Sequence, residues 1–286
     1  MNVDPGLFSP VTMVGTRDLQ VYPLYGQEKD LGAIDAPLFP TNGIELLVYA
    51  IGSDVVSGAS PGPYTHTISQ TNTLPSVTVE KNLGNYQSIQ FAGTRVNKFS
   101  IKGAATDTEA QMTCDLVAQS FAILNSPSAV VLVDETPFVF AEFTLTWNGF
   151  QISEASNFSL DIDNGVKASY TFNGSHEAQF ITPTFIHCSG SFDVVWDSLN
   201  DAQRGYFSQA VVSQTQAQLS FSMVHPASGG SITINLPRVH LGKPTTDPKM
   251  SEVIMQTIPF EAFKNVGGSP ATTINAVILN SRSTAY

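Results

Sequence analysis

The chain has 286 residues, of which 13 are basic and 24 acidic, leaving a formal net charge of −11 at pH 7. This length allows one large domain or two modest ones, each able to bury a core, and we expect two. The acidic balance argues against a nucleic-acid clamp, because binding to phosphates requires clustered Lys and Arg side chains.

The N-terminal residues 1–20 contain Pro5 and Pro10, which discourage regular structure, and we expect an arm there. A short strand is predicted at Leu31–Asp35.

A short helix is predicted next, because four apolar residues recur at helical spacing, namely Ile44, Leu47, Val48 and Ile51. Thr41 or Asn42 could cap this helix, and Gly52 would end it. The following segment, Gly52–Pro63, is rich in Gly, Ser and Pro and is expected to be an exposed loop.

Three consecutive strands are predicted between Leu74 and Gln119. The first, Ser76–Glu80, alternates apolar and polar residues as a half-buried strand does. The second, Tyr86–Lys102, is long enough to cross a whole domain, and Gly93 within it indicates a bulge or a sharp bend. The third is centred on Cys114, with apolar and polar residues again alternating.

A hairpin is predicted around Asn164-Gly165. Phe158–Asp163 alternates cleanly into this pair, and Lys167–Phe172 would return beside it. A turn is also predicted at Asn148-Gly149, after a strand that ends at Trp147.

The second half of the chain continues with a strand at Ile186–Trp196 and a second short helix from Asp197 to about Ala210. Three more strands are expected, at Gln218–Val224, Ser231–Leu241 and Val253–Phe263. The C-terminal residues from Asn265 onward are expected to form a second arm, in which Ile274–Leu279 could be a free strand.

The order of elements suggests an internal duplication. Gly32–Asp35 matches Gly190–Asp193, and each precedes a helix at a similar distance. Arg95-Val96 then matches Arg238-Val239, and each pair leads through a polar loop into a closing strand. We therefore expect a first domain over residues 1–155 and a second over 156–286, each with one arm.

Patterns that usually indicate chemistry are weak here. Gly58–Gly62 fits the G-x-S-x-G pattern of hydrolases, but it lies in a Gly/Pro loop rather than in a strand-to-helix elbow. Asp161–Gly165 has its Gly one position too early for a calcium loop. The five histidines lack metal-ligand spacing and are expected at the surface or in packing. No catalytic residue, metal or cofactor is expected.

The two cysteines, Cys114 and Cys188, lie in apolar alternating stretches and are expected to be buried thiols. A disulfide between them would require a geometry that the sequence does not show. No apolar run approaches the roughly 20 residues of a membrane helix, and no signal peptide is evident.

Two phrases resemble a known family. Leu74–Lys81 followed by Phe91–Phe99 is similar to the "L-P-S-x-T-x-E" and "F-x-G-x-x-V-N-x-L" phrases of the tail tube proteins of long-tailed bacteriophages, with Phe99 where Leu is usual. Ile258–Phe263 resembles the closing strand of that family. The resemblance implies an all-β fold with two short flanking helices, built from duplicated β-sandwich or barrel domains whose sheets join into a ring.

The resemblance also implies a function. The chain would be a structural, non-enzymatic subunit whose rings stack into the hollow tail tube that conducts the genome. Its expected partners are further copies of itself, the tape-measure protein, and the tail terminator and tail-tip proteins, with DNA only in transit. It would lie in the virion tail after assembly in the host cytoplasm. A virion adhesin or decoration protein that binds carbohydrate is the alternative.

The resemblance further implies rings of six domain equivalents, so that two domains per chain favour three chains per ring, with six chains as the alternative. The channel wall should be neutral to acidic, and the candidates on the polar sides of strands are Glu80, Asp115, Asp161 and Asp163. Each could equally face the outside. The candidate assembly helices carry Ile44, Leu47, Val48 and Ile51 in the first and Leu199 and Tyr206 in the second.

Overall fold

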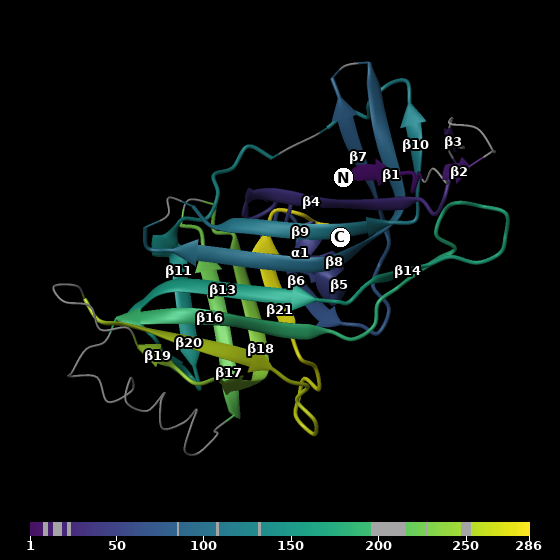
Figure 1. Cartoon of the computed structure of the whole chain (residues 1–286). Coiled ribbons are helices and arrows are strands. Elements are labelled where there is room, and N and C mark those ends of the chain that lie inside the picture. The colour runs from purple at the N-terminus through teal and green to yellow at the C-terminus, as the bar shows by residue number, and fades with distance from the viewer. Residues whose placement is uncertain are drawn as a thin grey trace.

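The computed structural model of the chain describes residues 1–7, 11–13, 19–21, 24–84, 86–106, 109–130, 133–195, 216–226, 228–246 and 253–286. In these residues the protein is predominantly β-structure with one short α-helix, which confirms the all-β prediction. The strands form two large sheets that pack face to face and a smaller sheet that protrudes from them (Figure 1). The sheets do not close into a barrel within the described residues.

The first large sheet, which we call the front sheet, consists of antiparallel neighbours in the order β4 (Lys29–Pro37), β9 (Gln111–Ala118), β8 (Gln87–Ala104), β13 (Ala155–Asp163), β16 (His187–Val195) and β20 (Met255–Ala262). At one end β1 (Asn2–Asp4) pairs with β4, and at the other β19 (Thr245–Thr246) pairs with β20. Figure 1 shows these strands running nearly horizontally.

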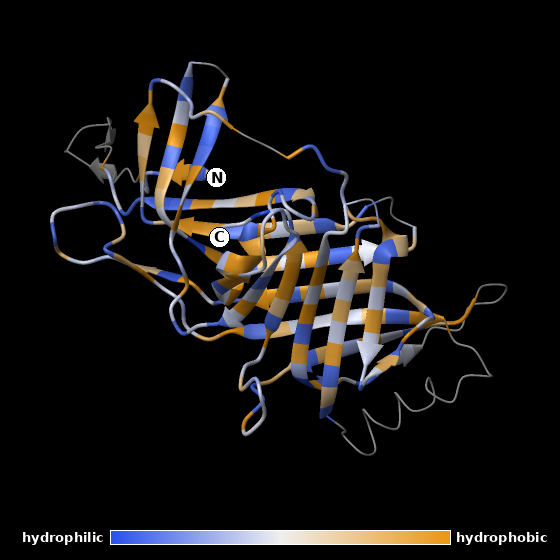
Figure 2. Cartoon of the chain, turned by 180° about the vertical axis from the view of Figure 1, so that it is seen from behind, coloured by the Kyte–Doolittle hydropathy of each residue, from blue (hydrophilic) through white to orange (hydrophobic). Residues whose placement is uncertain are grey.

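The second large sheet, the back sheet, has the antiparallel order β11 (Phe143–Trp147), β17 (Gln216–Val224), β18 (Ser231–Leu241), β21 (Asn275–Asn280), β6 (Tyr64–Gln70) and β5 (Gly52–Ser57). Its strands run across those of the front sheet, and their hydropathy alternates along each strand (Figures 1 and 2). Because β18 also pairs with β20 through Val239–Leu241, the two sheets are joined along one side.

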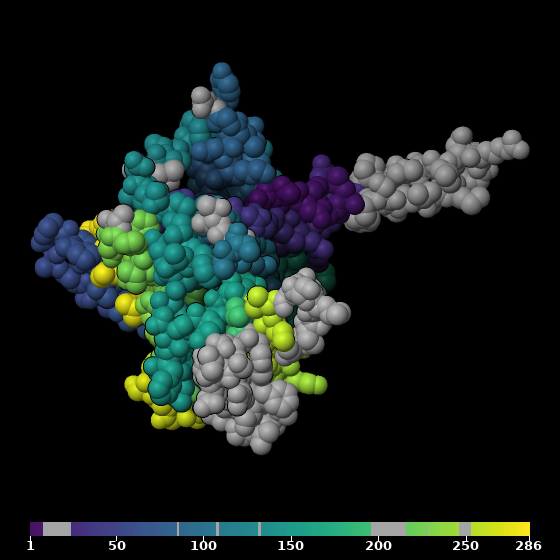
Figure 3. All heavy atoms as spheres, turned by 90° about the vertical axis from the view of Figure 1, so that its left-hand side faces the viewer, coloured from purple at the N-terminus to yellow at the C-terminus, as the bar shows by residue number. Residues whose placement is uncertain are grey.

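The protruding sheet is made by the first half of β8 with β7 (Val77–Leu83) and β10 (Ser120–Leu124). It stands above the body of the molecule in Figure 3. The predicted irregularity at Gly93 is confirmed, since this residue has φ +62° and two residues of β8, Ala92 and Gly93, lie opposite one residue of β7, Thr78. The bulge turns β8 out of the front sheet and into the protruding sheet.

The remaining elements are short. β12 (Phe150–Gln151) forms a hairpin with β11 through the predicted Asn148-Gly149 turn. β14 (Lys167–Ser169) pairs with β15 (Phe180–Thr182), and β2 (Val11–Met13) pairs with β3 (Leu19–Val21). A single 3-10 turn, η1 (Phe140–Glu142), precedes β11.

Helix α1 (Glu45–Ile51) confirms the first predicted helix, and Gly52 ends it as expected. The predicted cap is wrong, because the N-cap residue is Ile44 and no side chain caps the helix. Instead the Glu135 carboxylate accepts hydrogen bonds from the backbone N–H groups of Thr41 (2.9 Å) and Asn42 (2.6 Å). A residue distant in sequence thus satisfies donors just before the helix.

The predicted hairpin at Asn164-Gly165 is wrong. β13 pairs with β8 and β16, whereas β14 leaves the front sheet and pairs with β15. The buried Asn164 amide donates to the carbonyls of Ala50 (3.0 Å) and Val96 (3.1 Å), which fixes the chain at this point. Asn164-Gly165 therefore turns the chain, but the segment that follows it does not pair with β13.

One segment expected to be a loop and one expected to be a free strand are both strands of the back sheet. Gly52–Ser57 is β5, so the exposed loop is confined to the residues between it and β6. The expected free strand at Ile274–Leu279 is β21, which lies between β18 and β6 with Ile274, Ala276 and Ile278 fully buried. Residues Asn2–Asp4, expected in an arm, form β1.

The predicted second helix, from Asp197 to about Ala210, lies outside the described residues. Both halves of the chain contribute to one continuous apolar core, which includes Phe99 and Ile101 from the first half and Phe192 and Ile258 from the second. The division into domains at residue 155 stays a prediction, and it falls at the first residue of β13.

Candidate functional site

The outward face of the front sheet is a continuous polar surface. Strand register aligns one row of side chains across every strand of the sheet, in the order Asp35, Thr113, Ser100, Asp161, Ser189, Glu261, and then His240 of β18. A neighbouring row contains Asp115, Lys98, Asp163 and His187. Residues at alternate positions face the core, so the two sides of this sheet are sharply different in polarity.

Three of the four predicted channel-facing carboxylates share this polar face, namely Asp115, Asp161 and Asp163. Asp161 accepts a hydrogen bond from Ser100 Oγ and lies 3.7 Å from Lys98 Nζ. Further along the face, His187 Nε2 lies 2.9 Å from Glu261 Oε1, and both side chains are about half exposed, at 46% and 47%. The Lys98–Asp161 and His187–Glu261 contacts are solvent-exposed and of small energetic value, so the face remains hydrated.

Glu80, the fourth candidate, lies apart from the other three. It belongs to β7 of the protruding sheet, and its carboxylate accepts a hydrogen bond from the Ser128 N–H at 2.8 Å. Hydrogen bonding to Ser128 is the main cause that lowers the pKa of this carboxyl. Strand alternation correctly predicts that Glu80 lies on the polar side of its strand. The bulge in β8, however, places β7 in the protruding sheet, so Glu80 does not lie on the polar face of the front sheet.

The four apolar residues of the first candidate assembly helix face the core. Ile44, Leu47 and Ile51 are fully buried and Val48 is 1% exposed, so they hold α1 against β5, β6 and β8. An assembly role of α1 stays a prediction and would rest on its more exposed residues, such as Glu45 and Tyr49. Leu199 and Tyr206 lie outside the described residues.

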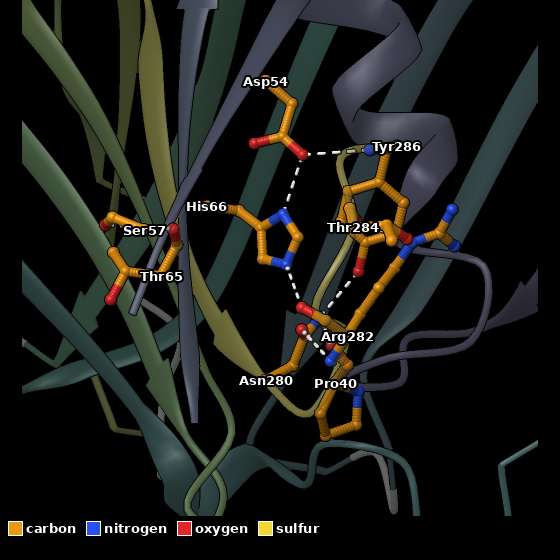
Figure 4. Close-up of polar contacts among 9 residues, drawn as sticks. All are labelled: Pro40, Asp54, Ser57, Thr65, His66, Asn280, Arg282, Thr284 and Tyr286. Carbon is orange, nitrogen blue, oxygen red and sulfur yellow. Dashed lines mark hydrogen bonds and ion pairs between the residues drawn. The ribbon is translucent and has the colours of Figure 1, made fainter. Parts of the chain in front are cut away.

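The most buried ionisable pair lies under the C-terminus. His66 Nδ1 is 2.7 Å from Asp54 Oδ2, and both side chains are essentially inaccessible (Figure 4). The other ring nitrogen, Nε2, lies 3.0 Å from the Arg282 carbonyl oxygen. The Tyr286 N–H donates to Asp54 Oδ2 at 3.0 Å, and its ring packs 4.8 Å from that of His66.

This arrangement holds the C-terminal segment in place. Asn280 Nδ2 donates to the Pro40 carbonyl and to Tyr286 Oη, and the Arg282 guanidinium lies 4.3 Å above the Tyr286 ring. Burial is the main cause that raises the pKa of Tyr286 to about 12. Both nitrogens of His66 are engaged inside the protein, so the pair serves packing, as the sequence suggested for the histidines.

A second buried acidic group lies at the start of β4. Asp30 is 3% exposed, and its burial, reinforced by repulsion from Glu28, raises its pKa to about 7. Burial also raises the pKa of Glu28. The segment before β15 closes over them, since the Glu28 N–H donates to the His176 carbonyl (2.9 Å) and Tyr170 Oη donates to the Glu28 carbonyl (2.5 Å).

Both cysteines are buried free thiols, as predicted. Cys114 and Cys188 lie in the same cross-strand row, separated by Phe99 and Ile162 on two intervening strands. Strands lie about 4.8 Å apart, so the two sulfurs are too distant for a disulfide. Burial raises the pKa of each thiol to about 12.

Within the described part of the chain, no group of three or more His, Cys, Asp and Glu side chains is arranged to hold a metal ion. No helix in that part is long and apolar enough to cross a membrane.

Sequence reasoning missed the two ends of the front sheet, β1 and β19. Each pairs with a strand on one side among the described pairings. A signal for β1 exists in the sequence, because Val3–Gly6 reads Val-Asp-Pro-Gly and Ile162–Gly165 reads Ile-Asp-Asn-Gly.

Comparison with known proteins agrees with this architecture. The model of a family described as phage tail tube protein matches residues 13–262, which is most of the chain. No curated protein matches it. Because the match extends from the N-terminal residues to the end of β20, the chain belongs to the phage tail tube protein family.

Proposed function

We propose that this chain is a ring-forming subunit that stacks into the hollow tail tube, the conduit for delivery of the phage genome into the host cell. The observation that carries the proposal is the family match over residues 13–262. The fold supports it, because the front sheet is polar on its outward face and ends in strands paired on one side among the described pairings. Open edges favour association, and ring closure removes them.

The polar face of the front sheet is the best candidate for the channel wall. Its carboxylates include Asp35, Asp115, Asp161, Asp163 and Glu261, and its lysines include Lys29, Lys98 and Lys102. A wall with this balance would repel DNA phosphates rather than bind them, so that DNA passes without sticking.

The strand order supports an internal duplication and rings of three chains. β4, β9 and β8 are neighbours in the first half, and β16, β20 and β18 are neighbours in the same order in the second. If residues 1–155 and 156–286 are equivalent domains, three chains would close a ring with a pseudo-sixfold arrangement. Six chains per ring are expected if the repeat is only an internal symmetry of one domain.

The tube would have the usual neighbours of a virion tail. It would surround the tape-measure protein and end at the tail terminator and tail-tip proteins, after assembly in the host cytoplasm. The carbohydrate-binding alternative lacks support from Trp147, which is 4% exposed and cannot stack on a sugar.

Electron microscopy of the purified chain tests the proposal. Tubes with a central channel are expected, and averaging with imposed and released symmetry counts the chains per ring. Dispersed monomers or trimers that bind glycans would contradict it in favour of an adhesin.

A further inference from the structure

Strand β13 joins the two similar halves of the front sheet. It pairs along one side with β8, where Asp161 lies opposite Ser100 and Asp163 opposite Lys98. Along its other side it pairs with β16, where Asp163 lies opposite His187. The chain therefore contains one complete example of how one half attaches to the next.

Strand β1 occupies the same place on β4 that the end of β13 occupies on β16. Asp4 lies opposite Lys29, the first residue of β4, just as Asp163 lies opposite His187, the first residue of β16. Both pairings are antiparallel and keep the same register over the two preceding residues. Asn2 lies opposite Leu31, just as Asp161 lies opposite Ser189.

The turn that follows each strand is also the same. Asp4 Oδ1 accepts a hydrogen bond from the Gly6 N–H at 3.0 Å, and Asp163 Oδ1 accepts one from the Gly165 N–H at 2.8 Å. Gly6 has φ +56° and Gly165 has φ +52°, a conformation that favours glycine. Sequence, register and turn geometry thus agree that β1 is a counterpart of the last residues of β13.

The counterpart of the β8 edge can be located through strand partners. Asp35 lies opposite Thr113, and the matching Asp193 lies opposite Thr257, so these two threonines correspond. The same comparison can be extended to the strands that pair with β9 and β20 on their other sides.

Thr113 lies opposite Ser100, and Thr257 lies opposite Thr245. Thr245 of β19 therefore corresponds to Ser100 of β8. Within the chain β13 covers this position on β8, whereas among the described pairings β19 pairs with β20 alone. At β1, Lys81 Nζ donates to the Met1 carbonyl (3.1 Å) and to Asn2 Oδ1 (3.4 Å), but no second strand pairs with β1 or β19 among the described pairings. These two strand edges are the two halves of the junction that β13 completes elsewhere.

We propose that β1 of one copy pairs with Lys243–Thr246 of the next copy, in the register that β13 uses on β8. Asn2 would lie opposite Thr245, and Asp4 opposite Lys243. The partner is a second copy of this chain, and the inference rests on the proposed ring-forming function. The contact is head to tail, so it repeats until the front sheet closes on itself.

The charges at the two edges are complementary in this register. Lys98 lies between Asp161 and Asp163 on the polar face, 3.7 Å from the former. Lys243 is exposed and would lie beside Asp4, so the junction between copies would repeat the arrangement inside the chain. Pro244 has no N–H donor, so the backbone hydrogen bonds between the two copies would be donated by the residues on either side of it.

The test is a disulfide between Asn2→Cys and Thr245→Cys in the full-length chain, assembled into tubes and then oxidised. The native Cys114 and Cys188 are buried and do not compete. On a non-reducing denaturing gel the monomer band should be replaced by one closed multimer, and its mass counts the chains per ring. The matched control combines Asn2→Cys with Ser189→Cys, since Ser189 lies on the same face between two paired strands.

A charge exchange gives an independent measurement. Asp4→Lys and Lys243→Asp should each reduce tube formation, and the double variant should recover it relative to either single variant. Tubes from the Asn2→Cys/Thr245→Cys chain without crosslinking above the control would overturn this inference and leave the tube function intact. Absence of tubes from the unmodified chain would instead overturn the proposed function, and this inference with it.

Discussion

The buried polar residues of this protein serve the fold more than any chemistry. Asp54 and His66 show this best, because they are inaccessible and are closed over by the C-terminus. Asp54 Oδ1 is buried without a hydrogen-bond partner, so the contact with His66 is the main interaction that offsets the cost of burying this carboxylate. A buried carboxylate that loses its partner is strongly destabilising.

We expect His66→Ala to lower the free energy of unfolding by about 3 kcal/mol, because it leaves the buried Asp54 carboxylate with the Tyr286 N–H as its remaining hydrogen-bond donor. Chemical denaturation followed by circular dichroism measures this. His187→Ala is the matched control, since it removes a His–carboxylate pair that is half exposed and should cost about 0.5 kcal/mol. Equal losses in the two variants would contradict a special role of the buried pair.

Asp30 predicts a pH dependence. Its pKa is raised to about 7 in the folded chain from an ordinary value of 3.8, so the folded state favours the protonated carboxyl. The associated stability is present below about pH 4 and is lost as the pH rises through 7. Asp30→Asn should therefore raise the thermal midpoint at pH 8 relative to the unmodified chain, and this advantage should shrink toward pH 5. An advantage that grows on acidification would refute it.

At the scale of elements, several segments whose composition predicts arms or loops are strands of the folded sheets. β21 shows this, because it follows a Gly/Ser/Pro-rich segment near the C-terminus yet lies inside the back sheet between β18 and β6. Its residues alternate strictly between buried and half-buried. The C-terminal region is therefore part of the folded subunit.

Deleting Ser269–Tyr286 should make the protein insoluble or unfolded, because it exposes the edges of β18 and β6 and the core around Ile234 and Ile68. Deleting Ser281–Tyr286 alone keeps β21 and should yield a folded but less stable chain. Solubility after expression and the cooperativity of thermal unfolding distinguish the two. A folded, soluble product of the longer deletion would mean that β21 is dispensable.

At the scale of the whole molecule, the front sheet separates an apolar core from a polar, largely acidic face. We expect Asp163→Lys to make assembled tubes retain double-stranded DNA, with retention falling steeply as salt increases. Glu80→Lys is the control, since it makes the same charge change on the protruding sheet. A filter-retention assay measures both, and equal retention would place the channel wall elsewhere.

The sequence by itself determined the type of structure and the family. Alternation in β9 and β13 placed their residues on the correct faces, and Gly93 marked the bulge in β8, because these patterns depend on backbone geometry within a few residues. The sequence phrases that resemble the family, Leu74–Lys81 and Phe91–Phe99, are likewise short stretches that can be read without knowing the tertiary structure.

Only the tertiary structure decided which strands are neighbours. Asn164-Gly165 has the composition of a hairpin, but β13 pairs instead with β8 and β16, because burial of the Asn164 amide and of the inward-facing residues Phe158, Leu160 and Ile162 outweighs the local turn preference. The same holds for the β1 and β19 edges and for the hydrogen bonds that the Glu135 carboxylate accepts from Thr41 and Asn42 just before α1. Such pairings join residues far apart in the chain, and their free energy comes from packing that no single segment contains.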